Sequence, residues 1–207
     1  SWTQLPITQK GKPSQVNALG QIGSDIIAAG FADGSPGYWR NGKWNALPVV
    51  NPKESSTVTS VAVNGEDIYF GGVNSSAPGY WKNAEWQSLP AEQKGSVVNA
   101  MVVRGTDVFA GGANGGVPGY WKNKQWVALT GASPSSGKLC TYQVDPFETV
   151  SAVKALVVLG DDVFAGGFVD DGSCGYNAGY WQNTTWHPLK PSKRGLASKV
   201  TSLVVVP

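Results

Sequence analysis

The chemically versatile side chains of this chain are few and widely spaced. His187 is the only histidine, and arginine occurs only at positions 40, 104 and 194. A metal centre or a catalytic triad needs several such groups at set spacings. A copper radical oxidase or a sialidase-type carboxylate clamp would need clustered His, Tyr or Arg side chains. The sequence therefore predicts a protein that is not an enzyme, with no catalytic residue, metal site or cofactor.

Aspartates recur along the chain, each within a short turn that contains glycine. They are Asp25, Asp67, Asp107 and Asp162, in the turns GSD, GED, GTD and GDD. Aspartate is a common turn residue because its carboxylate hydrogen-bonds nearby backbone. A glycosidase would instead need two unlike carboxylates facing each other across a cleft. We therefore expect these aspartates to be structural.

Aromatic residues beside short polar residues make the better case for a binding site. Indole and phenol rings stack on the apolar face of a sugar, and polar loop groups bind its hydroxyls. Adjacent strand residues point to opposite sides, so the two residues of a Tyr–Trp pair cannot share one face. We expect one set to pack against one neighbouring unit and the other set against the opposite neighbour. The candidate ligand-binding residues are Asp33, Trp39, Asn74, Trp81, Asn114, Trp121, Asp170, Asp171 and Trp181, with Tyr142 and Tyr176 in a second patch.

These residues belong to a motif that the chain repeats four times. It reads GYWRNGKWNALP at 37–48, GYWKNAEWQSLP at 79–90, GYWKNKQWVALT at 119–130 and GYWQNTTWHPLK at 179–190. Upstream of each copy lie two further β-type runs, such as VNAMVV and DVFAGG in the third unit. Four short strands in about 42 residues is the size of a propeller blade. The predicted blades are 16–48, 58–90, 98–130 and 153–190, within a single all-β domain over 1–207.

The repeat resembles the kelch unit in three positions. A glycine pair ends the second run, a tyrosine lies on the third and a tryptophan opens the fourth, as in Gly111–Gly112, Tyr120 and Trp126. The second and fourth units match as well, whereas the first has Ala29–Gly30 in place of the glycine pair. The additional tryptophan after each tyrosine is not a kelch feature. The resemblance implies a kelch-like β-propeller, an architecture shared with small propeller lectins.

The two ends of the chain read as parts of a fifth unit. Residues 1–6 (SWTQLP) match the fourth strand, and residues 199–207 (KVTSLVVVP) match the first. We expect five-fold repetition, with four complete blades and a short closing blade made from both ends. The alternatives are a four-bladed ring with the end strands on its rim, a natural chain that continues beyond Pro207, and an open edge that accepts a strand from another molecule.

The fourth unit departs from the repeat through two insertions. Residues 130–150 lengthen the connection into it, and its second and third strands are joined by a long loop. Each insertion carries one cysteine, and the strand order places both on the same side of the array. The sequence predicts a Cys140–Cys174 disulfide, worth a few kcal/mol in the loop-entropy model.

The bulk properties exclude some partners. The net charge is only +2 with 14% charged residues, which argues against nucleic acid, and no apolar run is long enough to span a membrane. The sequons at Asn74 and Asn183 and the cysteine pair favour a secreted or cell-surface protein. We expect a lectin-like module that binds glycans through repeated shallow sites. The alternative is a structural, adhesive or protein-binding module, or a filament subunit that self-associates through its incomplete blade.

Overall fold

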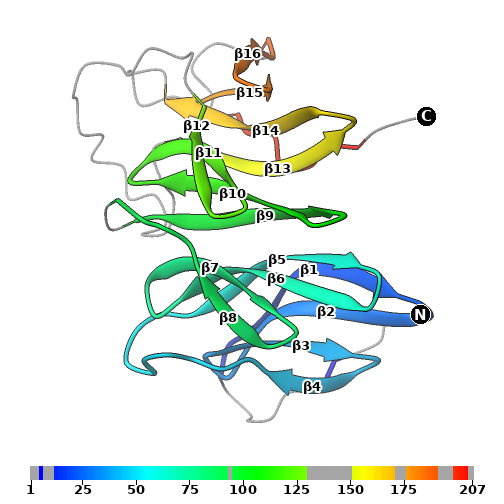
Figure 1. Cartoon of the computed structure of the whole chain (residues 1–207). Helices are drawn as coiled ribbons and strands as arrows, with labels where there is room; N and C mark the ends of the chain where they lie inside the picture. The colour runs from blue at the N-terminus through cyan, green and yellow to red at the C-terminus, as the bar shows by residue number, and fades with distance from the viewer. Residues whose placement is uncertain are drawn as a thin grey trace.

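The protein is an all-β array of four four-stranded antiparallel sheets. The computed structural model describes residues 5–6, 12–92, 95–129, 151–170, 176–190 and 198–204, and within these it contains strands and no helix (Figure 1). The strands are β1 (Ser14–Ile22), β2 (Asp25–Ala32), β3 (Ser35–Arg40), β4 (Lys43–Ala46), β5 (Thr57–Asn64), β6 (Asp67–Asn74), β7 (Ala77–Lys82), β8 (Glu85–Ser88), β9 (Val97–Arg104), β10 (Asp107–Asn114), β11 (Val117–Lys122), β12 (Gln125–Ala128), β13 (Ala152–Leu159), β14 (Asp162–Asp170), β15 (Tyr176–Gln182) and β16 (Thr185–Pro188).

Each sheet is one sequence repeat, folded as an up-and-down meander. Sheet 1 has the order β1-β2-β3-β4, sheet 2 β5-β6-β7-β8, sheet 3 β9-β10-β11-β12 and sheet 4 β13-β14-β15-β16. The connections within a sheet are tight because glycine and asparagine supply the positive φ angles they need, such as Gly105 at 57° and Asn123 at 49°. The sheets follow one another in chain order, with β1 beside β5, β5 beside β9 and β9 beside β13 (Figure 1).

A β-bulge interrupts the first strand of every sheet. The register with the second strand shifts at Asn17, Thr59, Asn99 and Lys154. Three of these side chains donate to a backbone carbonyl of the next sheet's first strand: Asn17 to Val58, Thr59 to Val98 and Asn99 to Val153, at 2.6 to 2.9 Å. The bulge thus frees one polar side chain in each of sheets 1 to 3 to tie neighbouring sheets together.

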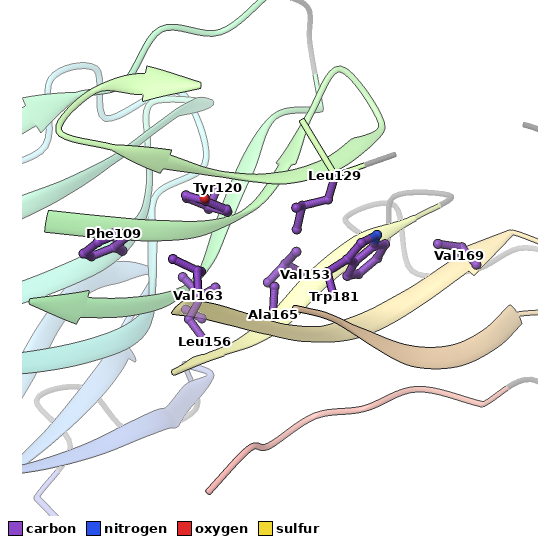
Figure 2. Packing of buried hydrophobic residues seen from close by; sticks show 10 residues of the cluster. Phe109, Tyr120, Leu129, Val153, Leu156, Val163, Ala165, Val169 and Trp181 are labelled. Carbon is purple, nitrogen blue, oxygen red and sulfur yellow. The ribbon is translucent and has the colours of Figure 1, made fainter. Parts of the chain in front are cut away.

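The three largest clusters of the core are equivalent interfaces between successive sheets. Figure 2 shows the third, where Phe109, Tyr120 and Leu129 of sheet 3 meet Val153 and Trp181 of sheet 4. The same positions build the interface between sheets 1 and 2 and that between sheets 2 and 3. The expected division of each Tyr–Trp pair is confirmed, because Tyr80 packs toward sheet 3 while Trp81 packs toward sheet 1.

The glycine pair of the repeat is explained by this packing. A Cβ on Gly111 would lie 2.8 Å from the Leu156 side chain of the next sheet, and one on Gly112 would overlap the carbonyl of Val97 in the bulged strand. The first glycine therefore makes room for the neighbouring sheet, and the second makes room for the bulge. Ala29 replaces the first glycine in sheet 1, where the facing side chain is the smaller Val61.

The described parts of the two end segments lie at opposite ends of the array. Leu5 packs on Trp39 of sheet 1, where Leu47 packs on sheet 2 in the equivalent contact. Val200 and Leu203 lie over Gly166 of sheet 4, in the place that Val153 and Leu156 take over Gly111. These contacts repeat those that the corresponding positions make between neighbouring sheets, and the fifth unit itself stays a prediction. The described residues of the expected closing strands, 5–6 and 199–204, are not in strand conformation.

Candidate functional site

The loops between the second and third strands lie beside the connections between sheets, as the strand order predicted. We call this side of the array the loop face. At sheet 2, Asn74 Oδ1 accepts hydrogen bonds from Val50 N at 3.2 Å and Ser56 Oγ at 3.3 Å, and its Nδ2 donates to the Pro48 carbonyl. Asn74 is buried. Its side chain therefore fixes two loops to each other, and no part of it is available to a ligand.

Asn114 repeats this arrangement in sheet 3. Its Oδ1 accepts from Glu92 N at 3.0 Å and Ser96 Oγ at 2.9 Å, and Ser96 Oγ accepts from Gly115 N. Asn114 is buried as well. Asn74 and Asn114, which were expected to bind hydroxyl groups, thus stabilise the loops of the loop face through buried hydrogen bonds.

The tryptophans of the third strands are core residues. Trp39, Trp81, Trp121 and Trp181 are all at most 2% exposed, so none presents a ring on which a sugar could stack. Trp39, Trp81 and Trp121 each donate Nε1 to the carbonyl of a proline before the sheet, namely Pro6, Pro48 and Pro90, at 2.9 to 3.0 Å. The equivalent residue for Trp181 is Thr130, outside the described residues, and no described residue accepts from Trp181 Nε1.

The remaining candidate ligand-binding residues do not form one site among the described residues. Asp33 lies in the loop of sheet 1, and its two carboxylate oxygens are buried with no hydrogen-bond partner among the described residues. Tyr176 opens β15 and packs edge-on against Phe168, with ring centroids 4.7 Å apart. Asp170 ends β14. The other predicted positions, Asp171, Tyr142, Cys140 and Cys174, lie outside the described residues, as does the predicted disulfide.

At the opposite end of each sheet, an asparagine joins the two hairpin turns. In sheet 3, Asn123 Nδ2 donates to Asp107 Oδ1 at 2.7 Å, and Asn123 Oδ1 accepts from Val108 N at 2.9 Å. Asn41, Asn83 and Asn183 make the same bonds in the other sheets. The recurring aspartates are structural, and their partner is this asparagine.

Cations complete these turns in three of the four sheets. Arg40, Lys82 and Lys122 reach the aspartates at 2.5, 2.8 and 3.1 Å, respectively, and sheet 4 has the neutral Gln182 instead. The pKa of Asp107 is lowered by the hydrogen bond from Asn123 and then by that from Lys122. For Asp67 the Lys82 hydrogen bond lowers the pKa most, followed by that from Asn83. These charges are partly exposed and paired. This end of each sheet, which we call the turn end, therefore carries structural ion pairs in sheets 1 to 3.

The two predicted glycosylation sites differ in their accessibility. Asn74 Nδ2, the atom that would carry a glycan, is buried and donates to the Pro48 carbonyl. The fold therefore does not present Asn74 for modification. Asn183 lies in an exposed turn and bonds to Asp162 through the same atom, at 2.8 Å.

Sequence reasoning missed the asparagines of the turn end and the bulge residues. The turn asparagine was visible as the N of GYWRN, GYWKN and GYWQN, which recurs in all four motifs. The bulge position is Asn17, Thr59, Asn99 and Lys154 in the four units, so no single residue type marks it. A pattern search that asks for identical residues therefore cannot find them.

The exposed part of the loop face at sheet 2 is a polar network, which we call the Asn51 corner. Asn51 Nδ2 donates to Glu54 Oε1 at 3.0 Å and its Oδ1 accepts from Lys53 N at 3.1 Å. Ser75 Oγ accepts from Asn51 N at 2.6 Å and donates to the Asn51 carbonyl. Lys53 and Glu54 are exposed. The corner offers pre-oriented donors and acceptors to solvent, anchored by Asn74 below.

The described residues offer little else for chemistry. They contain no group of three or more His, Cys, Asp or Glu side chains arranged to hold a metal ion. His187 stacks on Tyr180, with ring centroids 4.9 Å apart and planes at 14°. Among these residues there is also no helix with the length and apolar character needed to cross a membrane.

Comparison with known proteins identifies no family for the chain. No protein-family model matches the sequence, and no curated protein matches it. The kelch resemblance therefore remains a similarity of motifs. Among solved structures the chain is similar to the computationally designed Ika4 protein, with a TM-score of 0.46 and 20% identity, over 88% of this chain and 99% of that chain. A likeness at this TM-score and identity says nothing about the function of the chain.

Proposed function

We propose that the chain is a non-catalytic, carbohydrate-binding module, built as a β-propeller-like array and acting at a secreted or cell-surface location. The observation that carries the proposal is the Asn51 corner, where exposed polar groups are fixed in place by a buried asparagine. Fixed donors and acceptors recognise hydroxyl groups at a low entropic cost, because they are already ordered before the ligand arrives.

The repeat supports binding at more than one place. Sheet 3 has the same buried support through Asn114 and Ser96, while the exposed residues above it differ from those of sheet 2. A constant framework with a variable surface suits shallow sites that gain strength together through multivalency. The ligand contacts are therefore assigned to exposed loop groups, and no longer to the buried tryptophans.

A glycan array followed by competition with the free sugar tests the proposal. We expect a signal that Asn51→Ala, which removes the side chain linking Lys53 and Glu54, reduces by about tenfold in affinity, or roughly 1.4 kcal/mol. Lys43→Ala is the matched control, because Lys43 is an exposed residue that opens β4, away from the corner. An array without any signal, or equal losses in both variants, would contradict the proposal.

A further inference from the structure

Sheet 1 and sheet 4 each expose one of the two faces that meet in the interfaces between successive sheets. On sheet 1, Val16, Leu19 and Ile26 are 39, 71 and 53% exposed, and we call these residues the leading face. Their equivalents in sheet 4 are Val153, Leu156 and Val163, which are buried against sheet 3. The leading face is therefore one side of an interface whose other side none of the described sheets supplies.

The opposite side of the same interface is exposed on sheet 4. Leu159 and Leu189 are 54 and 48% exposed, and with the partly buried Phe164 and Tyr180 they form what we call the trailing face. In sheet 1 the equivalent residues Ile22, Leu47, Ile27 and Tyr38 pack against sheet 2. Leu47 is only 3% exposed there, which shows how completely this position is covered when a neighbouring sheet is present.

We propose that the leading face of one molecule docks on the trailing face of a second copy of this chain, in the geometry of the three internal interfaces. The occupant follows from the repeat, because the chain itself shows three times which residues cover each face. The contact is heterologous, so two copies that meet at both ends close a ring, and copies that do not close form a chain.

Segments of the chain's own ends occupy part of both faces in the single molecule. Leu5 takes the place over Trp39 that Leu189 of a neighbour would take. Val200 and Leu203 take the place over Gly166 that Val16 and Leu19 of a neighbour would take. Both segments are irregular, and 198–204 is held to sheet 4 by the bonds Val200 N to Gly167 O and Ser198 N to Tyr176 O. The two end segments therefore compete with a second molecule for these faces. The complete sheet of the second molecule displaces them.

Sedimentation velocity on the full chain over a wide concentration range tests the proposal. We expect the average mass to rise with concentration. Leu19→Asp on the leading face and Leu189→Asp on the trailing face should each weaken association by about tenfold or more, since each places a charge in an apolar contact. Val50→Asp is the matched control, because Val50 is 70% exposed in the connection between sheets 1 and 2.

Mixing the two face variants separates this proposal from a symmetrical contact. Leu19→Asp keeps an intact trailing face and Leu189→Asp keeps an intact leading face. The mixture should therefore form heterodimers with nearly the affinity of the unaltered chain, although each variant alone associates more weakly. Recovery in the mixture also demonstrates that both variants are folded.

Competition by the end segment gives a further readout. Leu203→Asp removes an apolar contact that holds 198–204 over Gly166, so we expect association at a lower concentration than for the unaltered chain. A chain that stays monomeric at every concentration, including as Leu203→Asp, would overturn the proposal. Equal behaviour of Val50→Asp and Leu19→Asp, or a mixture that does not associate, would overturn it too.

Discussion

An asparagine in one hairpin turn of each sheet makes the hydrogen bonds that a further strand residue would make. Asn123 accepts the bond from Val108 N through its side chain and donates its own backbone N–H to the Val108 carbonyl at 2.9 Å. Its φ of 49° lies in the left-handed region, which asparagine tolerates better than most residues. One side chain thus extends the ladder, fixes a turn and binds Asp107.

Replacing this asparagine tests its contribution. Asn123→Ala removes both side-chain bonds and places alanine at a positive φ, so we expect a loss of about 1–3 kcal/mol in the free energy of unfolding. Urea denaturation followed by tryptophan fluorescence measures it. Gln125→Ala, at the exposed start of β12, is the control and should change stability by less than about 0.5 kcal/mol. Equal values for the two variants would contradict the assigned role.

At the scale of the strand, the glycines mark where backbone and neighbouring sheets come close. Gly79 lies close to the next strand of its own sheet, because a Cβ there would lie 2.5 Å from both the Gln87 carbonyl oxygen and the Trp86 ring. Gly112 is more constrained, since a Cβ there would overlap the backbone carbonyl of Val97. A carbonyl within a strand cannot rotate away as a side chain can, so the first strand of sheet 3 would have to move.

We therefore expect Gly112→Ala to destabilise the protein by about 2 kcal/mol or more in thermal unfolding. Gly20→Ala, in the first strand of sheet 1, is the control, because a Cβ there would meet the Val61 side chain at 3.0 Å. That contact needs only a small shift of a side chain, so its cost should be clearly lower. If Gly112→Ala melts at the temperature of the unaltered protein, the bulge does not require this glycine.

The strands and their order were predictable from the sequence, because they depend on local patterns. β-branched and aromatic runs separated by glycine and asparagine recur four times, and the structure has four sheets in those places. The division of Tyr80 and Trp81 between opposite neighbours followed from the two-residue period of a strand. Neither conclusion needed contacts between distant residues.

The candidate site was less predictable, because its accessibility depends on tertiary packing. Trp121 and Asn114 have the residue types of a sugar-binding site, but their surroundings bury them. The sequence shows that Trp121 lies in a strand and does not show that the Pro90 carbonyl receives its N–H. The Asn51 corner escaped notice because it occurs once and therefore has no repeat signal.

At the scale of the whole molecule, the charges of the turn end couple stability to pH. The pKa values of Asp25, Asp67 and Asp107 are all lowered in the folded protein, that of Asp25 chiefly by Asn41 and then Arg40. A lowered folded-state pKa means that the unfolded chain takes up protons first as pH falls. The stabilisation is therefore complete well above pH 4 and is lost as pH falls through the folded-state pKa values.

We expect the melting temperature to fall steeply below about pH 4. The triple variant Asp25→Asn, Asp67→Asn and Asp107→Asn should melt lower than the unaltered chain at pH 7, and the two should converge in acid. Calorimetry across this range measures both effects. Asp162, whose partner is the neutral Gln182, remains in both proteins and serves as an internal reference. Parallel curves for the two proteins would contradict the assignment.

The equivalence of the three interfaces also bears on how the chain reaches its fold. Val58, Val98 and Val153 occupy one position on successive sheets and are all fully buried, so local chemistry alone distinguishes poorly between correct and incorrect neighbours. During synthesis each sheet leaves the ribosome when the preceding sheet offers the one uncovered surface of this kind. The order of translation therefore determines which two sheets pack together. A chain refolding from denaturant has no such order, and all four sheets compete for the same surfaces at once. Contacts that differ between the interfaces, such as the stacking of Tyr38 on Phe70 with ring centroids 4.6 Å apart, then favour the correct pairs of sheets.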